Sequence, residues 1–149
     1  FGIRKEPLKR LWVEFMKSSV IITGDDNLQT KQKKIEEFGD KQFLFANIQT
    51  IGTGVDGLQK VCDTMAFIEY PDTPDMMEQA KSRLERSGQK NNITVLHLMC
   101  SETIDKMQWD MLQKKAMVAD SINKGSFEGT EFKDFNQCII DRIRRRSDD

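Results

Sequence analysis

Two arginines stand three residues apart in the polar segment Gln79–Gln89, whose sequence is QAKSRLERSGQ. On a helix, Arg83 and Arg86 would share one face. Two guanidinium groups aimed at one place repel each other unless an anion lies between them, so this spacing indicates a site for an anion. The alternative is a solvated helix face on which Glu78 and Glu85 supply the counter-charges.

A glycine-rich segment, residues 52–57, matches two phosphate-binding patterns in part. Read as G-x-G-x-x-G it could bind a dinucleotide, but such a loop opens a long helix, and only Leu58–Asp63 separate it from the next predicted strand. Gly52 and Gly57 also have the spacing of a Walker A loop, yet Leu and Gln follow where that motif needs Lys and then Ser or Thr. The segment alone therefore cannot cradle a triphosphate in the usual way. A surface turn is the alternative interpretation.

Charge and cysteine content argue against several classes of protein. The 149 residues suit one compact domain or one lobe of a larger enzyme. Lys plus Arg (23) nearly balances Asp plus Glu (24), so the chain as a whole has no long-range positive field that would indicate nucleic-acid binding. Cys62, Cys100 and Cys138 form no C-x-x-C pair and do not support a disulfide framework or a zinc site. No apolar run approaches the roughly 20 residues of a membrane span, and His97, the single histidine, lies in a predicted strand.

Strands and helices alternate along the chain. Short apolar and β-branched segments predict strands at residues 19–23, 42–47, 64–70 and 93–99. Apolar residues at helical spacing predict helices that begin at Pro7, end at Gly39, or span residues 74–86, 103–123 and 131–145. This alternation predicts an α/β fold with a mainly parallel sheet covered on both faces. Because no strand precedes the first helix, we expect the chain to be part of a longer protein.

The arginine segment resembles motif VI of the Swi/Snf-type ATPases of helicase superfamily 2, Q-A-x-G-R-x-x-R-x-G-Q. Six of the seven fixed positions match, Ser82 replaces the motif's glycine, and Glu85 occupies a position that is often histidine. Other segments resemble further motifs of this family in the same order: Phe1 the end of motif IV, residues 23–38 its strand, glycine turn and helix, residues 43–59 motif V, residues 69–71 the segment before motif VI, and residues 103–115 the closing helix. The resemblance covers residues 1–123.

The resemblance implies the C-terminal, second RecA-like lobe of such an ATPase, an intracellular protein of the cytoplasm or nucleus. The expected fold is a three-layer α/β lobe over residues 1–123, with a mainly parallel sheet, followed by a helical extension over residues 124–149. In this family ATP and Mg²⁺ bind between two such lobes, and the first lobe carries the Walker motifs and holds Mg²⁺. The implied partners are therefore the N-terminal RecA-like lobe of the same protein and double-stranded DNA, with no membrane. We expect the isolated chain not to hydrolyse ATP.

The resemblance also implies roles for single residues. Arg83 and Arg86 are the expected arginine fingers, and Arg86 is expected to reach the γ-phosphate. The residues expected to contact the nucleotide are Gln79, Gly54 and Asp56. The residues expected to contact the DNA backbone are Thr50 and Gly52 of motif V, together with the lysine cluster Lys31, Lys33 and Lys34. A second basic cluster, residues 142–146, is more typical of a helix end, where cations are stabilising.

Two alternatives stay open. The chain could be a lobe of a strand-separating or restriction-type helicase, because the motifs of the second lobe are shared across the superfamily. It could also be a non-catalytic interaction module that retains the fold, in which case both arginines could be lost without consequence.

Overall fold

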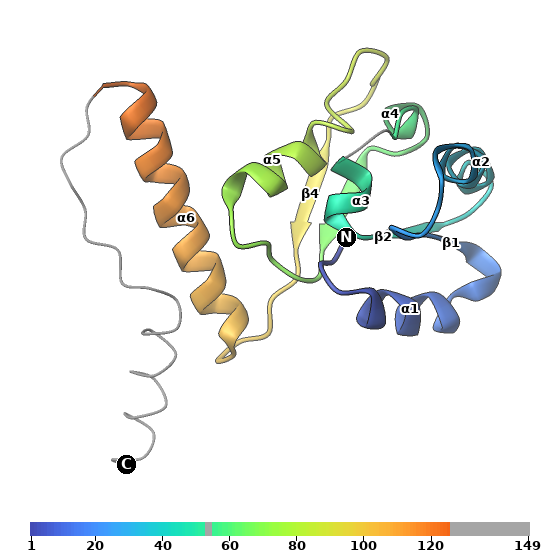
Figure 1. The fold of residues 1–149 in the computed structure, drawn as a ribbon, viewed down its shortest axis with the longest axis horizontal. Helices are drawn as coiled ribbons and strands as arrows, with labels where there is room; N and C mark the ends of the chain where they lie inside the picture. Colours follow the sequence, from blue (N-terminus) through green and yellow to red (C-terminus); the bar gives the residue numbers. More distant parts are fainter. Residues whose placement is uncertain (53–54, 126–149) are drawn as a thin grey trace. The chain divides into compact units, whose positions relative to one another are not determined.

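The computed structural model describes residues 1–52 and 55–125, drawn in colour in Figure 1. The chain divides into two compact units. The first comprises Phe1–Pro71 and Asp75–Leu98, and the second comprises Asp72–Pro74 and Met99–Asp149. The predicted helix over residues 131–145, the basic cluster at 142–146 and all but the first two residues of the predicted extension lie outside the described residues.

Four short strands of the first unit form two parallel pairs, which confirms the predicted strand direction. They are β1 (Ser19–Ile22), β2 (Phe43–Ala46), β3 (Thr64–Phe67) and β4 (Thr94–His97). In the β1–β2 pair Val20 lies opposite Leu44, and in the β3–β4 pair Met65 lies opposite Val95. All four strands were predicted, and each is one to three residues shorter than its predicted range.

The first two residues continue the sheet between the two pairs. Gly2 forms a parallel bridge with Asn47, directly after β2. The N–H of Ile68, directly after β3, donates to the carbonyl of Phe1 at 2.9 Å. A segment that precedes the first helix therefore occupies the position of a central strand.

Six α-helices lie in the described residues: α1 (Lys5–Glu14), α2 (Leu28–Phe38), α3 (Ile48–Gly52), α4 (Leu58–Val61), α5 (Pro74–Lys81) and α6 (Ile104–Asn123). α2 begins directly after its N-cap, Asn27, whose side chain accepts a hydrogen bond from the Thr30 N–H at 2.8 Å. This cap stabilises the start of the helix because it satisfies a backbone donor that has no partner within the helix. The short helices α3 and α4 were not predicted. They bracket the glycine-rich segment.

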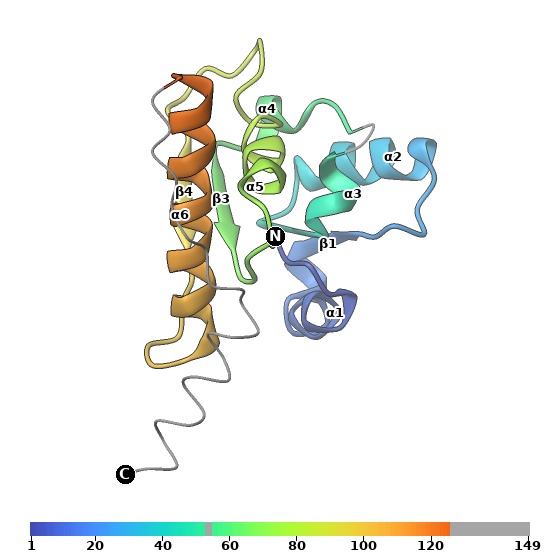
Figure 2. The ribbon, with the colours of Figure 1, turned by 60° about the vertical axis from the view of Figure 1, so that its left-hand side comes forward.

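Helices cover both faces of the β1–β2 pair. Figures 1 and 2 show α1 on one side of this pair and α2 and α3 on the other. The core between the strands and α2, α3 and α4 consists of buried apolar residues: Val20, Ile22, Ile35, Phe38, Ala46, Ile51, Val55 and Leu58. On the opposite face the ring of Phe15, after α1, lies 5.0 Å from that of Phe43. This three-layer α/β arrangement confirms the predicted fold class.

The second unit is built around α6, which begins and ends as predicted. The hydroxyl of its N-cap, Thr103, accepts a hydrogen bond from the Asp105 N–H. The helix ends at Asn123, and Gly125 adopts a positive φ of 68°, a conformation that glycine tolerates at helix ends. Among the described residues, no helix combines the length and apolar character that a membrane span requires.

Candidate functional site

Arg86 lies beside Asp56, which precedes it by 30 residues in the sequence. Its Nη1 donates to Asp56 Oδ1 at 3.1 Å, and the side chains are 37% and 72% exposed. The backbone N–H of Gly57, the Arg86 guanidinium and the Gln59 amide lower the pKa of Asp56 from its usual value. Asp56 is therefore an anion at neutral pH, and it holds one arginine of the predicted motif VI against the predicted motif V.

The two arginines lie in turns and not on a helix. α5 ends at Lys81, so the prediction that Arg83 and Arg86 share one helix face was wrong. The hydroxyl of Ser82 donates to the carbonyl of Gln79 at 2.8 Å, and the Arg83 N–H donates to Ala80 O at 3.2 Å. These bonds to the third preceding residue compete with the helical pattern and end the helix early.

The guanidinium of Arg83 shares its surroundings with the ion pair of Arg86 and Asp56. Burial lowers the pKa of Arg83, the positive charge of Arg86 lowers it further, and the carboxylate of Asp56 raises it. The two arginines are thus close enough to interact electrostatically, although they do not share a helix face. Leu84, between them, is fully buried and anchors the turn.

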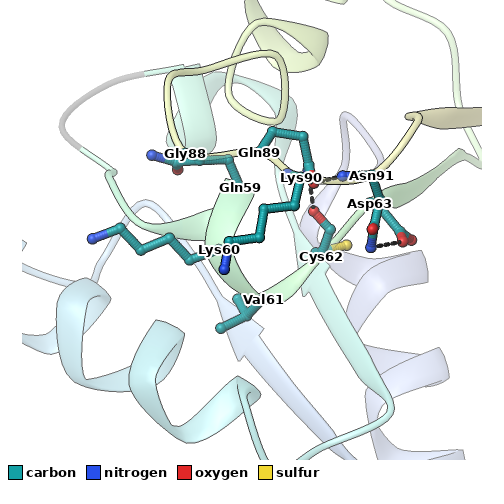
Figure 3. A pocket seen from close by; sticks show the side chains of 9 residues that line it. All are labelled: Gln59, Lys60, Val61, Cys62, Asp63, Gly88, Gln89, Lys90 and Asn91. Carbon is teal, nitrogen blue, oxygen red and sulfur yellow. Dashed lines mark hydrogen bonds between the residues drawn. The ribbon is translucent and has the colours of Figure 1, made fainter.

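Two glutamines connect α4 with the loop that carries Arg86, and Figure 3 shows both side chains. Gln59 is only 6% exposed, and its Oε1 accepts from the Gly57 N–H at 3.1 Å. Its Nε2 lies 3.4 Å from both Asp56 Oδ1 and the carbonyl of Ser87. Gln89 Nε2 donates to the carbonyl of Cys62 at 2.9 Å.

These glutamines belong to the wall of a cavity of about 580 Å³ between residues 59–63 and 88–91. Sequence reasoning gave Gln89 a place in the motif and gave Gln59 no role. Gln59 follows the apolar Leu58, and nothing in the spacing shows that its amide is buried.

Two of the residues predicted to contact DNA, Thr50 and Gly52, lie in the short helix α3. Thr50 lies in α3 and is buried. Its hydroxyl lies close to Gly24 in the turn after β1, where a side chain in place of the glycine would come within 3.6 Å of Thr50 Oγ1. Gly52 is the last residue of α3.

The three lysines of the predicted cluster do not form one exposed patch. Lys31 is buried, Lys34 Nζ binds Asp26 Oδ1 at 2.7 Å, and Lys33 is exposed. Of the residues predicted to contact the nucleotide, Gln79 is exposed on α5, Asp56 pairs with Arg86, and Gly54 lies outside the described residues.

The chain is similar in sequence to known helicases and chromatin regulators. No family model matches the chain. It is 29% identical over 114 residues to Helicase domino of Drosophila melanogaster, covering 75% of the chain and 4% of that protein. It is 28% identical over 87 residues to the SWI/SNF-related matrix-associated actin-dependent regulator of chromatin subfamily A-like protein 1 homolog of Caenorhabditis elegans, covering 58% of the chain and 13% of that protein.

The resemblance to Swi/Snf-type ATPases is confirmed. The fold agrees with it, because the solved C-terminal part of the Fun30 ATPase domain matches with a TM-score of 0.69 and 17% identity. That match covers 75% of this chain and 37% of the solved one. The predicted RecA-like α/β lobe is thereby confirmed as well. The Swi/Snf-like lobe spans only a small part of the two curated relatives.

Proposed function

We propose that the chain is the second motor lobe of an ATP-dependent translocase that moves on double-stranded DNA in the cytoplasm or nucleus. The observation that carries the proposal is the contact between Arg86 and Asp56. It joins the loop between α5 and β4 to the segment between α3 and α4. These two segments are the ones that resemble motifs VI and V, so the contact brings together the residues expected to face the nucleotide.

The residues at this contact suit the terminal phosphate of ATP. Arg83 and Arg86 supply two guanidinium groups close to one another, and Arg86 is exposed enough to exchange its carboxylate partner for a phosphate oxygen. Bound ATP would supply a phosphoryl group whose charge grows as it leaves, and an arginine placed there accelerates the reaction by about 10³ to 10⁵. The first lobe would hold Mg²⁺ and the inner phosphates, while Gln79, Gly54 and Asp56 of this chain would orient the nucleotide.

DNA would lie along motif V. The hydroxyl of Thr50 and the backbone near Gly52 can position phosphates without reading bases. The exposed Lys33 would add a cation, whereas Lys34 would act through Asp26, whose Oδ2 accepts from the Thr23 N–H at 2.7 Å and holds the turn next to α3. Lys31 is buried and would contribute through packing or a local rearrangement.

Phosphate release tests the proposal most directly. We expect residues 1–149 alone to show no ATP turnover, and the two-lobe protein to show turnover that duplex DNA stimulates. Turnover that copurifies with the isolated chain would overturn the two-lobe assignment. Stimulation by single-stranded DNA alone would favour the strand-separating alternative, and a two-lobe protein without turnover would favour the interaction module.

A further inference from the structure

Gln59 is a polar side chain held almost entirely out of solvent at the junction of three backbone segments. It lies on α4, and its amide reaches residues 56–57 and the loop that carries Arg86. A buried amide without partners would cost free energy, so the bonds to Gly57, Asp56 and Ser87 account for its presence in the interior. Each partner lies next to, or is, a member of the candidate site.

The geometry gives Gln59 a specific effect on Asp56. Asp56 is exposed, and an exposed carboxylate samples several rotamers unless neighbouring donors fix it. The amide Nε2 of Gln59 lies 3.4 Å from the same Oδ1 atom that accepts from Arg86 Nη1. The contact of Nε2 with Ser87 O reaches the residue directly after Arg86. One amide group therefore contacts the carboxylate of the ion pair and the backbone of the residue next to its arginine.

We propose that Gln59 is a positioning residue, which acts through Asp56 and the backbone of Ser87 to fix the direction of the Arg86 guanidinium. This inference rests on the proposed function, in which Arg86 reaches the γ-phosphate. Gln59 itself contacts neither ATP nor DNA. Its contribution is to reduce the number of orientations that Arg86 samples before the nucleotide is bound.

Gln89 offers a matched control. It is also a glutamine that joins α4 to the same loop, with Nε2 at 2.9 Å from Cys62 O, and its Oε1 accepts from the N–H groups of Lys90 and Asn91. These side-chain hydrogen bonds involve neither Asp56 nor the guanidinium of Arg86. Loss of Gln89 should therefore weaken the loop without acting through the arginine.

The test is a double-mutant cycle in the two-lobe protein, with steady-state kcat and KM for ATP measured in the presence of duplex DNA. The variants are Gln59→Leu, Gln89→Leu and Arg86→Lys, with each glutamine variant also combined with Arg86→Lys. Arg86→Lys keeps the charge, so its turnover stays measurable. Gln59→Met replaces Gln59→Leu if the leucine variant does not fold, because methionine is uncharged and has nearly the length of glutamine but lacks the donor to Asp56. Thermal unfolding of every variant shows whether it is folded.

We expect Gln59→Leu to lower kcat about twofold to tenfold, the range that one or two neutral hydrogen bonds supply, with KM for ATP little changed. In combination with Arg86→Lys it should cause little further loss, whereas Gln89→Leu should cause the same fractional loss with or without Arg86→Lys. An equal loss from Gln59→Leu in both backgrounds, or no loss at all, would overturn the inference. Normal turnover of Arg86→Lys alone would instead overturn the proposed function.

Discussion

Replacing Arg86 by alanine should separate catalysis from folding. Within the described part of the Swi/Snf-like lobe, this arginine forms one ion pair, with Asp56 at 3.1 Å, and the carboxylate is largely exposed. Exposed ion pairs contribute little to folding, because water solvates both partners when the pair is lost. The stability of the fold should therefore hardly depend on Arg86. In a closed, dry cleft, by contrast, no water is present to stabilise the charge that develops on a leaving phosphoryl group, so loss of the arginine is not compensated.

The expected size of the catalytic effect follows from that difference. An arginine finger accelerates phosphoryl transfer by about 10³ to 10⁵, which corresponds to roughly 4–7 kcal/mol of activation free energy. We expect Arg86→Ala to lower kcat by about a thousandfold or more while KM for ATP changes little, because the contact is strongest in the transition state. Arg83→Ala should act in the same direction.

The assay is DNA-stimulated phosphate release by the two-lobe protein, with thermal unfolding measured on the same samples. Arg10→Ala is the matched control, because Arg10 is also a surface arginine in an exposed ion pair, 3.7 Å from Glu6. Both variants should melt close to the wild-type temperature, and only Arg86→Ala should lose turnover. Near-normal turnover of Arg86→Ala would refute the reasoning. An equal loss in Arg10→Ala would show that surface charge in general, and not this site, was responsible.

Two further predictions concern DNA and acid stability. With a net charge of −1, the isolated lobe should bind duplex DNA weakly and without sequence preference, and fluorescence anisotropy at several salt concentrations should give a slope that reflects only a few phosphates; tight or salt-insensitive binding would contradict this. Burial raises the pKa of Asp26, but Lys34 and Thr23 lower it more, so its pKa in the folded chain is below the usual value. Such a carboxylate stabilises the fold above its unfolded pKa of about 3.9, and this contribution is lost as the pH falls through the folded pKa. Asp26→Asn should lower the free energy of unfolding by about 1–2 kcal/mol at neutral pH. In urea unfolding, the variant should also lose less stability than the wild type below about pH 4. Parallel pH profiles of the two proteins would rule out this role.

The strands and long helices were predictable because their local signals agree with the tertiary structure. The run Ser19–Ile22 holds three β-branched residues, and all but Ile21 are buried. α2 has both a polar cap and an apolar stripe. α3 carries no such signal. Five residues are too few for a helical period, and isolated helices of that length are unstable in water. α3 exists because Ile48 and Ile51 are buried against the rest of the first unit.

The candidate site was predictable in its members and not in its geometry. The motif identified Arg83 and Arg86, but it placed them on a helix that in fact ends at Lys81. No spacing rule pairs Arg86 with Asp56, because only the fold brings these residues together. The role of Gln59 depends on burial, which a single polar residue in a short apolar stretch does not reveal.

The exposure of the ion pair between Arg86 and Asp56 also explains why a lobe would carry it at all. A buried pair would fix the arginine firmly, but breaking it would leave an uncompensated charge, at a cost of about 3–5 kcal/mol, and would oppose transfer of the guanidinium to a phosphate. An arginine without a partner would sample many rotamers, and ordering it would cost free energy when ATP arrives. At 37% and 72% exposure the two side chains lie between these limits. The pair limits the directions in which Arg86 points before a nucleotide is bound, and water can solvate the carboxylate that the arginine leaves behind.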